Sequence, residues 1–249
     1  DGRDTDASDP GDWVATDYCY SGSSARNSTW HGTHVAGTIA ASTDNATGVS
    51  GITYNMALVT PVRVLGKCGG YISDIADGIR WAAGGSVYGL DDNPNPAKVI
   101  NMSLGGSGTC SLTYQNAIDS AVSSGATIVV AAGNSNTDVS TFQPANCNSV
   151  VTVAATNFYG ARSYYSNYGS AVDLAAPGGG SGGHILSTLN SGQQTPGSDI
   201  YAYYQGTSMA APHVAGIAAL MYLKNPGLAP AQVEEILVTN TRSFPSGCS

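Results

Sequence analysis

The feature that most constrains the fold is an alternation of short apolar segments with longer segments of helical periodicity. The short segments are rich in Val, Ile and Ala, and they are residues 57–65, 98–104, 127–133, 150–156 and 171–178. Strands that alternate with helices favour a parallel sheet whose crossover helices cover both faces. We therefore predict an α/β fold in three layers, with a mostly parallel sheet flanked by helices.

The other segments predict five helices, at residues 31–41, 72–83, 113–125, 208–225 and 229–241. The second and third carry apolar residues at intervals of three and four, and Gly125 is a suitable helix stop. The first and fourth are apolar almost throughout, which predicts buried helices, and the last predicts a surface helix. No repeat, heptad pattern or low-complexity linker divides the chain, so we expect one domain over residues 1–249.

Composition argues against several classes of partner. Only 10% of the residues are charged, the formal net charge is -8, and no basic run occurs, all of which argue against a nucleic-acid partner. No apolar run approaches the roughly 20 residues that span a bilayer. The chain opens with DGRDTDASDP instead of a basic and apolar leader. We expect a monomer that binds neither nucleic acid nor a membrane.

The five cysteines indicate an oxidising compartment. They stand at positions 19, 68, 110, 147 and 248, and no C-x-x-C pair suggests a zinc finger or a thioredoxin-like motif. Scattered cysteines, few lysines and many Ser, Thr and Tyr residues favour a secreted protein. The sequence does not fix the pairing. Pairing of nearest neighbours predicts Cys19–Cys68 and Cys110–Cys147, and leaves Cys248 without a partner in this chain.

The segment GTSMAAPHVAG, residues 206–216, places Ser208 at the expected start of a buried helix. One interpretation is structural, because serine oxygens accept hydrogen bonds from the free N–H groups of a helix start. The other is chemical. A helix start favours developing negative charge, and this suits a nucleophile that attacks a carbonyl.

Two further motifs favour the chemical interpretation. WHGTHVAG provides His31 at a helix start, and VVAAGNSN provides Asn134 at the end of a strand. A hydrolase that attacks an amide needs a hydroxyl, an imidazole that takes its proton and a donor for the oxyanion. Each residue alone also has a structural explanation: His31 as a capping or core histidine, and Asn134 as a turn residue.

His31, Asn134 and Ser208, in this order and with their flanking glycines, resemble the subtilisin-like serine proteases. The resemblance extends to NMSLGG and AAPG and covers nearly the whole chain, and it is closest to secreted bacterial members with disulfides. It implies a secreted endopeptidase that acts on protein or peptide substrates. His31 would be the general base, Ser208 the nucleophile, and the Asn134 amide with the Ser208 N–H the oxyanion hole.

The resemblance also implies a substrate cleft between two chain segments. Its residues would be Ser103, Leu104 and Gly105 on one edge, Gly69, Gly70 and Tyr71 on the other, and Gly133 beside Asn134. Backbone pairing with an extended peptide would explain broad endopeptidase activity. The alternative is that NMSLGG is only a strand followed by a turn.

Calcium is the expected cofactor, at one of two candidate sites. The acidic N-terminal segment offers the carboxylates of Asp4, Asp6, Asp9 and Asp12, although such a segment is more often a solvated loop. The segment STDNATGVSG resembles the calcium loop of subtilisins, with the Asn45 side chain and the carbonyls of Thr47 and Val49 as ligands. The sequence does not separate these two sites.

One departure from the family concerns the third member of the triad. The family carries an Asp in a strand-ending Asp-Ser/Thr-Gly motif before the histidine, and no such motif occurs here. We assign neither Asp4 nor Asp6 to this role. We expect the chain to be truncated at both ends, as the central part of a longer secreted precursor.

Two rival functions remain open. The first is a catalytically dead relative that serves as a binding or structural module, for which the absent aspartate argues. The second is a metalloenzyme that uses His31 and His34, although the H-x-x-H spacing and the lack of a Glu do not match the metalloprotease motif. We expect His34 and His213 to be structural and His184 to be a loop residue.

Overall fold

A computed structural model describes residues 8–244. The helices are α1 His31–Ala40, α2 Ile72–Ala82, α3 Leu112–Ser123, α4 Thr207–Lys224 and α5 Pro230–Thr239, with a 3₁₀ turn η1 at Val139–Thr141. The strands are β1 Val99–Met102, β2 Gly106–Ser107, β3 Thr127–Ala131, β4 Phe142–Gln143, β5 Val151–Thr156, β6 Leu174–Pro177, β7 Ile185–Asn190 and β8 Asp199–Tyr204. All five predicted helices are present, and each predicted boundary lies within two residues of the observed one.

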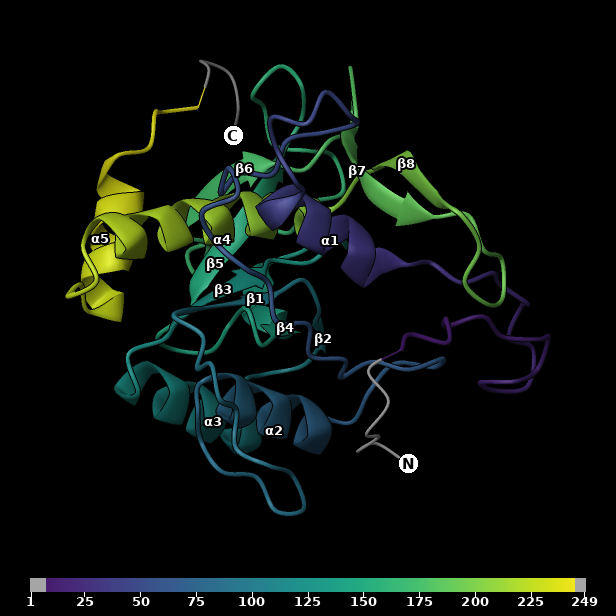
Figure 1. The fold of residues 1–249 in the computed structure, drawn as a ribbon, viewed down its shortest axis with the longest axis horizontal. Coiled ribbons are helices and arrows are strands. Elements are labelled where there is room, and N and C mark those ends of the chain that lie inside the picture. The colour runs from purple at the N-terminus through teal and green to yellow at the C-terminus, as the bar shows by residue number, and fades with distance from the viewer. Residues whose placement is uncertain (1–7, 245–249) are drawn as a thin grey trace.

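The centre of the molecule is a parallel sheet of four strands in the order β1-β3-β5-β6. Helices α2 and α3 cover one face, while α4 and α5 cover the other (Figure 1). Helix α1 lies beside α4. The predicted three-layer α/β fold is confirmed.

The alternation of side chains along β3 explains the layers. Ile128 and Val130 pack into the core beneath α2 and α3, whereas Val129 packs into the core beneath α4 and α5. Successive side chains of a strand point to opposite faces, so an uninterrupted apolar strand requires cover on both. Every residue of β3 is buried.

The predicted strand at residues 57–65 is wrong. This segment pairs with no strand among residues 8–244, and Leu58 in it is 99% exposed. A strand forms only where a neighbour accepts and donates its backbone hydrogen bonds, and within the described chain β1 pairs with β3 alone. Within this segment the side chains of Val62 and Val64 approach α2, at Gly78.

Two antiparallel pairs were not predicted. Strands β7 and β8 form a hairpin ribbon over six residue pairs, and β2 pairs with β4 over two. The β7–β8 ribbon packs against α1 and encloses His34, whose ring stacks on Tyr204 with 4.6 Å between centroids.

Both predicted disulfides are confirmed. Cys19–Cys68 joins the N-terminal loop to the segment before α2, and Cys110–Cys147 joins the start of α3 to the segment before β5. Cys248 lies outside the described residues. Among residues 8–244, no helix combines the length and the apolar character needed to cross a membrane.

Candidate active site

Ser208 is the second residue of α4, and its hydroxyl does not cap the helix. The N-cap is Gly206, with φ of 151°, and the helix start has no side-chain cap. The half-buried Ser208 hydroxyl lies 3.4 Å from the carbonyl oxygen of Ser103. The structural interpretation of Ser208 as a cap is therefore excluded, and its hydroxyl has no role in building the helix.

Pro212 leaves the backbone carbonyl of Ser208 without its usual partner. In an α-helix the carbonyl of residue 208 would accept from the N–H of residue 212, but proline has no N–H. The Ser103 hydroxyl donates to this carbonyl at 2.8 Å instead. Ser103 in turn accepts from the Asn101 side-chain amide at 3.0 Å, so the end of β1 is tied to the backbone of the nucleophile candidate.

The side chain of Asn134 is oriented by Thr207. Its Oδ1 accepts from the Thr207 backbone N–H at 2.8 Å and from the Thr207 hydroxyl at 3.0 Å. The same hydroxyl oxygen accepts from the Gly133 N–H at 3.0 Å. Because Thr207 holds the oxygen of this amide, the Nδ2 of Asn134 faces away from Thr207.

Two hydrogen-bond donors lie beside Gly206. A Cβ added at Gly206 would lie 3.4 Å from Asn134 Nδ2 and 3.7 Å from both Asn134 Oδ1 and the Ser208 backbone nitrogen. The φ of 151° also disfavours a side chain at this position. Two fixed N–H donors that share one space are suited to stabilising an oxyanion.

His31 is the first residue of α1, and its environment favours the neutral imidazole. Burial lowers the pKa of His31 below its ordinary value, the nearby His34 lowers it further, and the carboxylate of Asp12 opposes both. A neutral imidazole can accept a proton. Among residues 8–244 no carboxylate and no serine hydroxyl is hydrogen-bonded to His31, so Asp12 acts on it through charge alone.

The first predicted cleft edge lies directly beside Ser208. Ser103, Leu104 and Gly105 follow β1, which ends two residues before the predicted strand end at residue 104, and Gly133 follows β3 with φ of 103°. The ring of Phe142 packs closely against Gly105 and Gly133. A Cβ on either glycine would collide with this ring.

The second predicted edge is on the surface. Gly69 and Gly70 form the turn before α2, and Tyr71 is the N-cap of α2 with 79% of its surface exposed. The Cys19–Cys68 disulfide anchors this turn.

The other histidines occupy the expected structural positions. The fully buried His34 presents Nε2 to the carbonyls of Ile185 and Ala202, each at 3.1 Å, so this nitrogen carries the hydrogen. His213 Nδ1 is bonded to the Met209 carbonyl at 2.8 Å, and His184 lies exposed in a loop. No group of three or more metal-ligating His, Cys, Asp or Glu side chains occurs in the described chain.

The two candidate calcium segments differ in what their oxygens contact. Asp9 lies 3.3 Å from Arg63, and both carboxylate oxygens of Asp12 accept from the Thr29 hydroxyl. Asp4 and Asp6 fall outside the described residues. In the second segment Asn45 Oδ1 accepts from the Thr47 N–H at 3.1 Å, and Asn45 and Thr47 are exposed while Val49 is partly buried.

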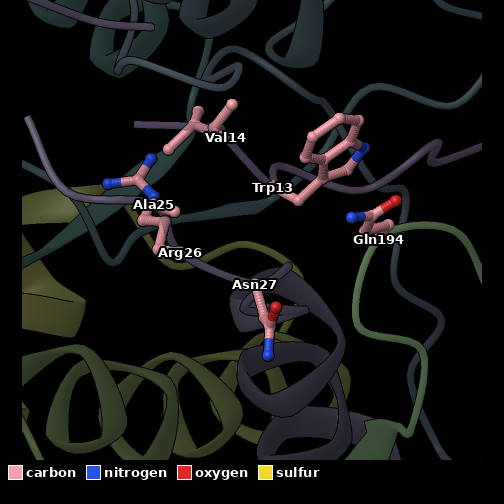
Figure 2. Close-up of a pocket in the computed structure, with 7 residues that line it drawn as sticks. Trp13, Val14, Ala25, Arg26, Asn27 and Gln194 are labelled. Carbon is pink, nitrogen blue, oxygen red and sulfur yellow. The ribbon is translucent and has the colours of Figure 1, made fainter. Parts of the chain in front are cut away.

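A cavity of about 290 Å³ lies apart from these residues (Figure 2). Its walls are residues 13–15 and 25–27 together with Gln194. None of the catalytic candidates lines it, so it is not the space in front of Gly206.

A serine at the start of a helix, with an oriented amide at the carboxyl end of a parallel strand, is an arrangement suited to an α/β serine hydrolase. The chain belongs to the subtilase family, whose family model matches residues 3–248. The predicted family, a subtilisin-like serine protease, is confirmed.

Relatives and solved structures give the same result. The chain is 58% identical over 249 residues to an "Extracellular protease" of Xanthomonas campestris, with 100% of this chain and 42% of the relative covered. It is 50% identical over 252 residues to an "Extracellular basic protease" of Dichelobacter nodosus, covering 98% of this chain and 41% of the relative. A solved protease structure from Pseudoalteromonas arctica superposes with a TM-score of 0.94 at 58% identity, covering 99% of this chain and 74% of that one.

The chain thus spans less than half the length of these two relatives. A "cold adapted subtilisin-like serine proteinase" superposes with a TM-score of 0.70 at 37% identity, covering 92% of this chain and 73% of that one.

Three residues near the site were not predicted. Thr207 orients Asn134, Phe142 packs beneath the cleft glycines, and the fully buried Asn167 contacts the segment that carries Asn134. The only signal for Thr207 was its place in the Gly-Thr-Ser motif. The other two lie outside the motifs and carried none.

Proposed function

We propose that this protein is a secreted serine endopeptidase that cleaves peptide bonds through an acyl-enzyme on Ser208. His31 takes the proton of the Ser208 hydroxyl and later gives it to the leaving amine. The oxyanion binds the Asn134 amide and the Ser208 N–H. Relatives named as extracellular proteases and the two disulfides support the location and the class of substrate.

The observation that carries this proposal is the position of two N–H donors beside Gly206. Asn134 Nδ2 and the Ser208 backbone nitrogen lie close to Gly206, and Thr207 holds the opposite end of the Asn134 amide. Donors fixed before the reaction cost no reorganisation when charge develops, and this arrangement stabilises the transition state more than the substrate. A merely structural asparagine would need no such orientation.

The substrate in this proposal is an extended peptide of protein origin. Residues 103–105 leave β1 as partly exposed backbone, where a peptide can pair as an added strand. Backbone pairing reads little side-chain identity, so broad specificity is expected, with the enzyme acting as a monomer.

Labelling by a fluorophosphonate tests the proposal against its chief rival, a catalytically dead module. The reagent reacts with an activated serine and mimics the tetrahedral adduct. We expect one label, on Ser208, which Ser208→Ala abolishes and His31→Ala reduces strongly. A folded protein that takes no label and hydrolyses no peptide is instead a binding module.

The two catalytic candidates should also behave as one unit. Ser208→Ala and His31→Ala should each lower kcat about as much as the double variant does, because each removes the same proton transfer. Losses that multiply in the double variant would contradict a shared mechanism. The third expected member of the triad is an aspartate. Among residues 8–244 no carboxylate is hydrogen-bonded to His31, so this role is assigned to none of them.

Calcium binding by the loop of Asn45, Thr47 and Val49 is a further part of the proposal. Oxygen ligands from a flexible loop stabilise the folded chain without taking part in the chemistry. A chelator should therefore shorten the half-life of the enzyme at elevated temperature before it alters the initial rate of hydrolysis. Equal half-lives with and without the chelator would count against both calcium segments.

The zinc alternative has no support in the geometry. His34 Nε2 is held by two backbone carbonyls, and its stacking partner Tyr204 covers the ring. Activity that is lost only on treatment with a zinc chelator would reverse this conclusion.

A further inference from the structure

Asn167 is a fully buried amide that the proposed mechanism does not use. It lies in the connection between β5 and β6, thirty-odd residues from the catalytic motifs in sequence, and none of its surface is exposed. A buried side-chain amide costs free energy unless its donors and acceptor are satisfied. The printed partners of its side-chain amide and of its backbone N–H lie within residues 132–137, the segment that carries Asn134, while its backbone carbonyl accepts from the Ser166 hydroxyl at 3.0 Å.

The side-chain oxygen of Asn167 accepts hydrogen bonds from residues that follow Asn134. Its Oδ1 accepts from the Ser135 N–H at 3.0 Å, the Thr137 N–H at 3.2 Å and the Thr137 hydroxyl at 3.3 Å. These donors belong to an exposed loop without regular structure. One buried oxygen therefore sets the path of the chain after Asn134.

The nitrogens of Asn167 fix the residues that precede Asn134. Its Nδ2 donates to the Ala132 carbonyl at 2.8 Å, and its backbone N–H donates to the Gly133 carbonyl at 2.9 Å. The approach is so close that a Cβ on Gly133 would overlap Asn167 Nδ2. Asn134 is thus held from both sides by a single residue.

We propose that Asn167 is a positioning residue that holds the oxyanion donor Asn134 in place. The inference rests on the proposed role of Asn134. Thr207 sets the rotation of the Asn134 amide, whereas Asn167 sets where the backbone of Asn134 lies. Two fixed points are needed, because an amide that is correctly rotated but displaced by about 1 Å can lose roughly 100-fold in rate.

The chemistry of this position requires an asparagine. The contact with Ala132 needs a donor, while the contacts with Ser135 and Thr137 need an acceptor with more than one lone pair. An aspartate keeps the acceptor but turns a carboxylate oxygen towards the Ala132 carbonyl. An alanine loses both functions and leaves a cavity.

The test measures kcat and KM separately for Asn167→Ala and Asn167→Asp in the full-length protein. Each rate is divided by the concentration of active sites, which is obtained by titrating the reactive serine with a fluorophosphonate. The titration removes any misfolded fraction from the comparison. We expect kcat to fall by about 10- to 100-fold in both variants while KM changes by less than about twofold, since the oxyanion exists only beyond the ground state. Asn167→Asp preserves the volume and three hydrogen bonds, so it remains informative if the alanine variant does not fold.

Asn93→Ala provides the matched control. Asn93 is also a buried asparagine, and it joins two backbone segments through the Ala82 carbonyl at 3.1 Å and the Asn95 N–H at 2.9 Å. We expect Asn93→Ala to lower the melting temperature but to leave kcat per titrated serine unchanged. If Asn167→Ala behaves in the same way, Asn167 is only structural and the inference is overturned.

The double variant Asn134→Ala/Asn167→Ala identifies the route of the effect. If Asn167 acts through Asn134, the kcat of the double variant should lie within about twofold of the kcat of Asn134→Ala. Losses that multiply would overturn the inference. A separate outcome, in which Asn134→Ala itself leaves kcat unchanged, would remove Asn134 from the oxyanion hole and so refute that part of the proposed function.

Discussion

The Ser103 hydroxyl donates a 2.8 Å hydrogen bond to the backbone carbonyl of Ser208, the carbonyl that Pro212 cannot serve. A proline four residues after the nucleophile would otherwise leave a partly buried carbonyl without a donor. A hydroxyl from the segment after β1 thus replaces a helical N–H, and it joins the proposed nucleophile to the proposed edge of the substrate cleft.

Removal of this hydroxyl should destabilise the protein. We expect Ser103→Ala to lower the free energy of unfolding by about 1–3 kcal/mol, the cost of leaving a buried acceptor unpaired. Pro212→Ala restores an N–H in line with the carbonyl, so it should recover part of the loss in the double variant. Chemical unfolding of the four proteins measures the coupling. If Pro212→Ala has the same effect with and without Ser103, the two residues do not share this acceptor.

Thr207 should control turnover through its hydroxyl. Thr207→Val keeps the shape and the backbone N–H bond to Asn134 Oδ1, but it loses the hydroxyl bonds to Asn134 Oδ1 and to the Gly133 N–H, so the amide is held less firmly. We expect kcat to fall by about tenfold or more with little change in KM. Thr207→Ser retains the hydroxyl and should stay close to the parent enzyme. A slow serine variant would point to the lost methyl group instead.

The acid limb of the pH–rate profile should report His31. Burial and His34 lower the pKa of His31, so the imidazole stays neutral and the limb should lie below the ordinary value of about 6.5. Asp12 raises this pKa, so Asp12→Asn should move the limb of kcat/KM to still lower pH. Added salt screens the charge of Asp12, and the two profiles should then approach each other. A limb that Asp12→Asn leaves in place would show that this carboxylate does not act on His31.

His34 should make the protein less stable in mild acid. Burial lowers the pKa of His34 below that of the unfolded chain, which therefore binds more protons than the folded chain just below pH of about 6.5. The free energy of unfolding consequently falls as the pH drops through this range. His34→Gln removes the titration, so its melting temperature should depend less steeply on pH between about 7.5 and 5.5. His31 and His213 also have lowered pKa values and keep a residual slope. Equal slopes in the two proteins would exclude His34 as a source.

The helices could be predicted because their signals are local. The α3 helix has apolar residues at the required intervals and ends close to Gly125, and both features lie within one short segment. The strand predicted at residues 57–65 failed because pairing is not local. Its composition suits a strand, but no described neighbour completes its hydrogen bonds.

The β7–β8 ribbon could not be predicted from the sequence for a different reason. The face of β7 that packs on α1 includes Ser187, whose hydroxyl donates to the His34 carbonyl at 2.7 Å. A buried polar residue breaks the apolar alternation by which a strand is recognised. Gly192 and Gly197 lie between the two strands, but without the alternation no hairpin was predicted from the sequence.

Some residues of the candidate site could be predicted from the sequence and others could not. Ser208, His31 and Asn134 stand in motifs, so their chemistry could be inferred from residue type and order. Thr207 and Asn167 act through geometry, and the bond between Thr207 and Asn134 joins residues 73 positions apart. A hydroxyl or an amide in a polar segment has no sequence signal for such a partner.

The position of Ser208 on α4 makes catalysis a late product of folding. Helix α4 packs on all four strands of the parallel sheet and on α1, which carries His31. The nucleophile, its oxyanion donors and its base can therefore meet only after the strands have assembled around one helix. If the proposed mechanism holds, a chain in which α4 has not packed on the sheet lacks the assembled site and should hydrolyse no peptide.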